Sequence, residues 1–229
     1  MERYLWCEDS KSGYQFWRIL FKAVYPDIIV VTQNNNSQLS KAVGEIRDDG
    51  NIYYIILDTA IDNPDVLREL KRLNRNISGK NNVKIIKIHS FEFSLLSFEF
   101  LEQWVFAEED ELKEKRNEIL EAKNLFVKLI KHGGNTEELN EFKSVYHYSS
   151  QNNTEKISAK LLYEITRNTG FETSKSKIGE CFINSCCEWS NRQEDDICGL
   201  EHKRLTLSEK MKQLIERSVI QDALKEVGL

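Results

Sequence analysis

Acidic side chains gather where an apolar run of this chain ends. The segment NIYYIIL (51–57) leads directly into Asp58, and Asp62 and Asp65 follow in the sequence TAIDNPD. Carboxylates at the carboxyl end of a buried strand can hold Mg²⁺ or Mn²⁺, because these ions prefer oxygen ligands. Asp, Asn and Pro are also the usual residues of a turn before a helix, so a turn with a helix cap is the other interpretation.

Three further acids follow other apolar runs in the same way. Glu8 and Asp9 come after RYLWC (3–7), and Glu92 comes shortly after VKIIKI (83–88). Ligands of an open parallel sheet bind outside the carboxyl ends of its strands, so these side chains are expected to converge. A metal bound there would hold a phosphodiester and activate a water molecule. The predicted metal ligands are Glu8, Asp58, Asp62 and Glu92, with Asp9 in support.

The first part of the chain alternates between strand and helix patterns. Short β-branched and aromatic runs predict four strands, and apolar residues at helical spacing predict that the segments between these strands are helices. Alternation of this kind predicts right-handed crossovers and a mostly parallel, Rossmann-like α/β sheet with flanking helices. The expected strands are 3–7, 27–32, 52–57 and 83–88, and the expected helices are 13–24, 37–47 and 63–76.

The second part of the chain is expected to be helical. Its longest amphipathic pattern predicts a single helix over 108–132, and the chain is predicted to close with another over 207–229. The polar segment SSQNNTEK (149–156) is typical of a linker. We therefore predict an α/β domain over 1–106 and a helical region over 107–229.

Composition places the chain among globular proteins. It has 229 residues, of which 40% are hydrophobic and 30% are charged, and no apolar run approaches the ~20 residues that span a bilayer. The start MERYLWCEDS lacks the pattern of a secretory signal, so a cytoplasmic location is expected. The net charge of −5 argues against a generic nucleic-acid coat protein. It leaves room for a nucleic-acid enzyme with a local basic patch.

One such patch is expected on the helix after Asp58. Arg68, Lys71, Arg72 and Arg75 recur at helical spacing, and Lys11 follows the first acidic pair. These side chains could hold a phosphate backbone. A solvated helix face is the alternative interpretation of the same pattern.

The cysteines are unevenly placed, with a cluster near the end of the chain. Cys181, Cys186, Cys198 and His202 have donor types that suit tetrahedral Zn²⁺. The paired Cys-x-x-Cys knuckles of a strong zinc signature are missing, and free cysteine is often simply buried. A zinc site and a set of core cysteines both remain open.

The order of these motifs resembles that of TOPRIM domains. The run YLWCEDSKSGYQFW looks like their strand-then-glutamate opening, and YYIILDTAIDN looks like their strand that ends in an aspartate motif. IHSFEFSLLSF resembles a later acidic segment in TOPRIM proteins of the overcoming-lysogenization-defect group and related bacterial defence proteins. By this resemblance Glu8 would be the glutamate of metal binding or acid–base work, and Asp58 would be the first metal aspartate.

The resemblance implies a metal-dependent nuclease that acts on DNA or RNA in bacterial antiviral defence. The family motif is usually Asp-x-Asp, whereas this chain reads Asp58-Thr59-Ala60. The second hypothesis is therefore a non-catalytic TOPRIM-like module that binds a partner protein, or a second copy of itself, through its helical half.

Overall fold

A parallel sheet of four strands organises the first part of the molecule. The computed structural model describes residues 1–229 apart from 61, 107–109, 170, 175–176, 180–181 and 183–204. The strands run in the order β2-β1-β3-β4, and every neighbouring pair is parallel. Their bounds are β1 Arg3–Cys7, β2 Ile28–Thr32, β3 Ile52–Asp58 and β4 Val83–Ile88. The predicted Rossmann-like α/β sheet is thus confirmed.

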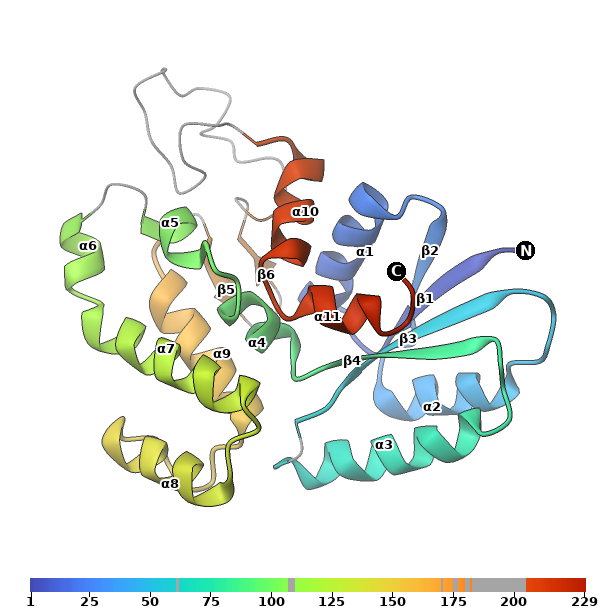
Figure 1. The fold of residues 1–229 in the computed structure, drawn as a ribbon, viewed down its shortest axis with the longest axis horizontal. Coiled ribbons are helices and arrows are strands. Elements are labelled where there is room, and N and C mark those ends of the chain that lie inside the picture. The colour runs from blue at the N-terminus through green and yellow to red at the C-terminus, as the bar shows by residue number, and fades with distance from the viewer. Residues whose placement is uncertain (61, 107–109, 170, 175–176, 180–181, 183–204) are drawn as a thin grey trace.

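The strand register brings the acid-bearing ends to one edge of the sheet. Cys7 pairs with Thr32 at the end of β1, and Asp58 pairs with Ile88 at the end of β3. Since all four strands point the same way, the residues that follow them leave the sheet at the same edge. In Figure 1 this edge faces the helices of the second part of the chain.

Helices cover both faces of the sheet (Figure 1). Side chains of a strand alternate between the two faces, so Ile55 and Leu57 pack in one core while Tyr54 and Ile56 pack in the other. The Ile55 face is covered by α2 Asn36–Glu45 and α3 Pro64–Ile77. The opposite face is covered by α1 Ser12–Val24, α10 Leu207–Glu216 and α11 Ile220–Lys225.

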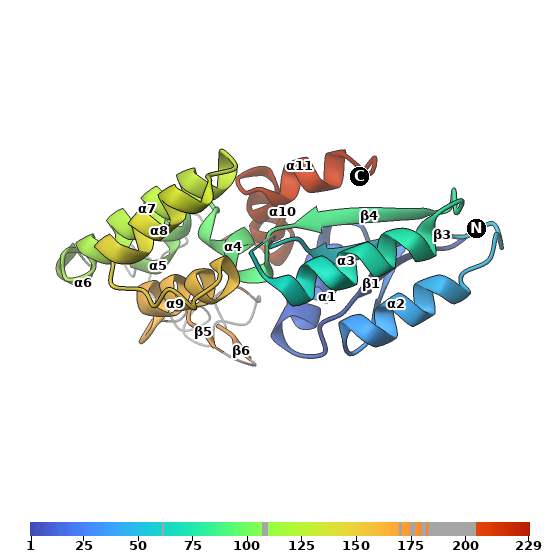
Figure 2. The ribbon, with the colours of Figure 1, turned by 90° about the horizontal axis from the view of Figure 1, so that it is seen from below.

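The remaining helices form a second layer beyond the carboxyl edge, as both views show (Figure 1, Figure 2). They are α4 Phe91–Leu96, α5 Leu101–Phe106, α6 Asp110–Glu114, α7 Asn117–Lys131, α8 Thr136–Val145 and α9 Thr154–Thr166. Two short strands follow, β5 Thr173–Ser174 and β6 Lys177–Ile178. No helix among the described residues is long and apolar enough to cross a membrane.

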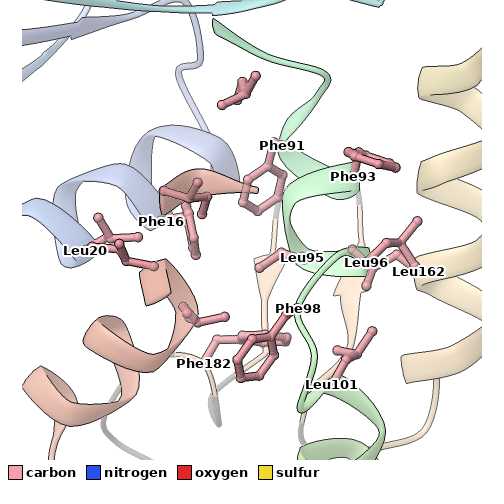
Figure 3. Packing of buried hydrophobic residues seen from close by; sticks show 14 of the residues in the cluster. Phe16, Leu20, Phe91, Phe93, Leu95, Leu96, Phe98, Leu101, Leu162 and Phe182 are labelled. Carbon is pink, nitrogen blue, oxygen red and sulfur yellow. The ribbon is translucent and has the colours of Figure 1, made fainter. Parts of the chain in front are cut away.

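One large apolar core joins this layer to the sheet. Figure 3 shows Phe16 of α1, Phe91 and Leu95 of α4 and Leu162 of α9 in that core, together with Phe182. Phe16 and Phe91 meet edge to face, with ring centroids 5.1 Å apart. The helix α4 therefore lies between the α1 layer and α9, and its position fixes α9 beside the carboxyl edge. The division of the chain near residue 106 remains a prediction.

Three expected segments differ from the structure. The predicted single helix 108–132 is interrupted between α6 and α7, where the buried Arg116 side chain donates hydrogen bonds to the carbonyl oxygens of Ile165 and Arg167. The predicted closing helix 207–229 is split between α10 and α11 near Ser218. The predicted linker 149–156 already contains the first turn of α9, which begins at Thr154.

Candidate functional site

The loop after β1 is held in place by its neighbour β2. Thr32 of β2 donates its hydroxyl proton to the backbone oxygen of Asp9 over 2.5 Å. The Cys7 side chain is fully buried beneath this loop. Glu8 and Asp9 are thereby fixed at the carboxyl edge, immediately before helix α1.

Gly13 gives the Asp9 carboxylate its place. A Cβ atom at residue 13 would lie 2.4 Å from both Cγ and Oδ2 of Asp9, which is closer than real Cβ contacts come. A glycine at residue 13 therefore leaves the room that the Asp9 carboxylate needs for its close approach to the first turn of α1. The partial positive charge at a helix N-terminus favours an anion at that place.

Asp58 ends β3 beside the last residue of β4. Thr59 anchors the turn, because its backbone N–H and its hydroxyl each donate to the carbonyl oxygen of Ile88 over 2.7 Å. Ala60 is fully buried. At the position where the resemblance to TOPRIM domains would expect a second aspartate, the chain thus has a buried methyl group, which contributes no ligand.

The turn that follows is tied to the second layer. Asp62 accepts hydrogen bonds from the backbone N–H of Thr154 (2.8 Å) and from its hydroxyl (2.6 Å). Asn63 donates from Nδ2 to Glu155 Oε2 over 2.5 Å. Both oxygens of Asp62 are therefore engaged at the start of α9, and its predicted role as a metal ligand stays a prediction.

Glu155 is an acidic residue of this site that the sequence patterns did not identify. It lies in the first turn of α9, after the N-cap Asn153. Hydrogen bonds between the turn after β3 and the start of α9 hold it at the carboxyl edge of the sheet, although it belongs to the other half of the chain. The sequence Asn-Thr-Glu carried a usable signal, because an Asn N-cap followed by an acid predicts a helix start.

Glu92 completes the group from the first turn of α4. Ser90 caps this helix by accepting a hydrogen bond from the backbone N–H of Phe93 over 3.1 Å. The cap follows directly from the end of β4, so Glu92 lies within one helical turn of the sheet edge.

The carboxylates lie close enough for their charges to interact. Burial raises the pKa of Glu8 to about 7, and repulsion from Asp9 and Glu155 adds to this, while a hydrogen bond from Asn36 opposes it. Burial, followed by repulsion from four acids, holds the pKa of Asp58 well above its usual range. Burial is also the largest cause of the raised pKa values of Asp9, Glu92 and Glu155.

Within the described residues, none of these five carboxylates forms an ion pair with lysine or arginine. Partly buried like charges without a counter-ion are unfavourable, since each disfavours ionisation of the others. A bound cation would remove this cost. The group therefore has the electrostatic character of a cation site.

A large cleft opens over the acidic group. Its volume is about 1310 Å³, and Glu8, Asp9 and Glu92 contribute to its wall. Asp58 and Glu155 are not part of that wall. The rest of the lining is mainly polar, with the amides of residues 34–36 and the basic side chains Lys11, Arg68 and Lys160. We call the basic side chains Lys11, Arg68 and Lys160 its basic rim, and the further acids Asp65 and Glu69 of α3 also line the cleft.

The predicted basic residues divide between the cleft and the surface. Lys11 and Arg68 line the cleft, whereas Lys71, Arg72 and Arg75 lie further along α3 and outside the lining. Arg68 forms an ion pair with Asp65, its neighbour on α3. The structure therefore brings two of the five to the acidic group.

The oxygen donors fit a hard divalent cation in their chemistry. Their present side-chain positions are not a finished coordination sphere, because among the described residues no three His, Cys, Asp or Glu side chains are arranged to hold a metal ion. Ligation would therefore require the carboxylates to move from these positions. The four residues of the possible zinc site, Cys181, Cys186, Cys198 and His202, lie outside the described residues.

Comparison of the chain with protein-family models, with curated proteins and with solved structures gave no match. The resemblance to TOPRIM domains accordingly stays a prediction from the sequence pattern, and the fold shown is a parallel Rossmann-like sheet with a helical layer at its carboxyl edge.

Proposed function

We propose that this protein is a divalent-metal-dependent hydrolase that cleaves phosphodiester bonds in DNA or RNA. The observation that carries the proposal is the convergence of five carboxylates beside a cleft with a basic rim. Among the described residues, none of the five has a cationic partner. The resemblance to bacterial TOPRIM proteins adds the expected setting, antiviral defence in the cytoplasm.

The metal would be held by Glu8, Asp58 and Glu92, with Glu155 added from α9. Mg²⁺ or Mn²⁺ at such a site supplies a Lewis acid and lowers the pKa of a bound water molecule. Asp62 and Asn63 keep Glu155 beside the sheet edge through their hydrogen bonds to the start of α9. In this proposal Asp62 is a positioning residue.

Glu8 is the best candidate for proton transfer. Where Glu8 does not bind the metal, its pKa of about 7 would let its carboxyl group exchange protons near neutral pH, as general acid–base work requires. Lys11 and Arg68 on the wall of the cleft are placed to neutralise phosphate oxygens of the substrate.

A cleavage assay tests the proposal. Labelled single-stranded and duplex DNA and RNA are incubated with the purified full-length chain in Mg²⁺, in Mn²⁺ or in EDTA. We expect cleavage that depends on the divalent cation. Absence of cleavage of all four substrates with both cations would contradict the proposal.

Replacing Gly13 with alanine should damage the site while sparing the fold. The added Cβ displaces the Asp9 carboxylate, so we expect cleavage to fall by roughly 10- to 100-fold. Thermal stability should hold or rise, because alanine favours a helix by about 0.5–1 kcal/mol over glycine. The matched control is Gly44→Ala in α2, where a Cβ would make only ordinary contacts. Equal activity of the two variants would contradict the role given to Gly13.

A second candidate function, association of two copies through the helical half, has one observation in its favour. A cleft of about 600 Å³ lies between α7 and α8, and Leu125 and Val145 beside it are 45% and 57% exposed. Lys128 lies on the α7 wall and Glu141 on the α8 wall, and neither forms an ion pair among the described residues. A two-fold rotation would place the basic wall of one copy against the acidic wall of the other.

Light scattering during size-exclusion chromatography tests this association. We expect a dimer for the wild type and an increase in its dissociation constant of about 100-fold for Leu125→Glu, because the interface would bury an unpaired carboxylate. Ile29→Glu, at an exposed apolar residue on β2, is the control and should leave the dimer intact. A monomeric wild type would rule out the association.

A further inference from the structure

One aromatic side chain stands apart from all others in the described part of the chain. Tyr163 is 46% exposed, whereas every other described Phe, Trp or Tyr is buried or only partly exposed. Its ring has no aromatic or cationic neighbour among the described contacts, and its hydroxyl forms no hydrogen bond there. An aromatic ring left in solvent forgoes the stabilisation that burial gives, so its position calls for an explanation.

That position is the wall of the cleft above the acidic group. Ala159, Lys160 and Tyr163 of α9 all line the cleft, and the helix also carries Glu155 in its first turn. Eight residues of α-helix separate Glu155 from Tyr163, which is a rise of about 12 Å along the axis. The small Ala159, one turn before Tyr163, leaves the face of the helix open between the ring and the acids.

From this placement we propose that Tyr163 stacks against an unpaired base of the substrate, which makes single-stranded nucleic acid the preferred substrate class. This inference rests on the proposed hydrolysis of phosphodiesters. Bases in a duplex are already stacked on one another and do not offer a face to a side chain. A groove with basic residues that follows the backbone, with an aromatic ring for the bases, is the usual form of a single-strand site.

The surroundings of the ring favour a nucleic acid over a protein partner. Tyr163 is the one large apolar side chain that lines the cleft among the described residues, whereas a docked helix or strand usually packs against several. Lys160 lies one turn before the ring, with its Nζ 5.9 Å from the centroid of Tyr148, and Lys11 and Arg68 complete the basic rim. A cationic rim and a lone ring suit a chain of alternating phosphates and bases.

Fluorescence polarisation with short labelled oligonucleotides in Ca²⁺ measures this binding apart from cleavage. We expect a single strand to bind more tightly than the matched duplex. Tyr163→Ala should weaken single-strand binding by roughly 10- to 100-fold, because base–aromatic stacking is lost. Tyr163→Phe keeps the ring and should bind like the wild type. Ile29→Ala, which removes an exposed apolar side chain on β2, away from both clefts, should also bind like the wild type.

The same variants in the Mn²⁺ cleavage assay separate this inference from the proposed function. If the wild type and Tyr163→Ala cleave single strands with equal activity, or if the protein prefers duplex, the stacking role is overturned and the proposed hydrolase activity stands. If single-strand binding depends on the Tyr163 ring but no cleavage occurs in Mg²⁺ or Mn²⁺, the proposed hydrolase activity is overturned and Tyr163 stands as a binding residue. Failure to bind a single strand would overturn the inference.

Discussion

Asp58→Asn is expected to lower metal-dependent cleavage by about a thousandfold or more. The change keeps the shape of the side chain and removes a carboxylate, so the loss of several kcal/mol of charge stabilisation in the transition state should appear as a fall in rate. The fold should persist, because asparagine removes the repulsion that Asp58 experiences from Glu8 and Asp9. The measurement is kcat/KM on a labelled oligonucleotide in Mn²⁺, beside a thermal melt of each protein.

The control for this variant is Asp48→Asn, the same chemical change in an exposed turn. It should cleave like the wild type. If Asp58→Asn melts well below the wild type, the loss of activity would report unfolding, and Glu155→Gln then tests the same group from α9. Full activity in Asp58→Asn would contradict the assignment of the acidic group as the active site.

The contribution of Glu8 to the stability of the metal-free protein is expected to fall as pH rises from about 4.5 to 7, while the lowered pKa of the buried His89 acts in the opposite direction. A carboxyl group whose pKa is raised by folding binds its proton more tightly in the folded state, so stability is lost as pH rises from the unfolded pKa through the folded pKa. For Glu8 the interval runs from 4.5 to about 7 and is worth roughly 3 kcal/mol. In a chain of this size the Glu8 contribution taken alone corresponds to a fall in Tm of roughly 6–12 °C, which the opposite contribution of His89 offsets.

A divalent cation should reverse this loss. Mg²⁺ or Mn²⁺ at about one hundred times its Kd adds about 2.7 kcal/mol at the upper end of the pH range, and the gain should vanish at low pH, where the carboxyl groups are protonated. Thermal melts across pH, with cation or with EDTA, measure both effects. A Tm that the cation leaves unchanged at the upper end of the pH range would contradict the account.

The sheet could be predicted from sequence because its strands are short, apolar and bounded by turn residues. The observed β1 and β4 match the predicted ranges, and β2 and β3 differ by one residue at one end. Parallel connection through helices then fixes which ends of the strands share an edge. The convergence of Glu8 and Asp58 is a consequence of this topology, so local pattern was sufficient to anticipate it.

The contribution of α9 could not be predicted in the same way. Glu155 reaches the site through hydrogen bonds between residues 92 positions apart, Asp62 to Thr154 and Asn63 to Glu155. Nothing in the periodicity of either segment indicates the other. Composition made 149–156 resemble a linker, whereas Asn153 caps α9 and the hydroxyl of Thr154 donates to Asp62.

The broken helices have a similar cause. The pattern over 108–132 is helical throughout, and the interruption near Arg116 depends on carbonyl groups at the end of α9. A buried guanidinium needs acceptors, and the chain supplies them from a distant segment. Such long-range satisfaction of polar groups is invisible to a local pattern.

Calorimetric titration of Mn²⁺ into the wild type and into Asp58→Asn tests the central claim most directly, namely that the acidic group at the carboxyl edge of the sheet binds a divalent cation. We predict saturable binding by the wild type above neutral pH and its loss in the variant. A wild type that does not bind the cation, or a variant that binds it equally well, would contradict the claim.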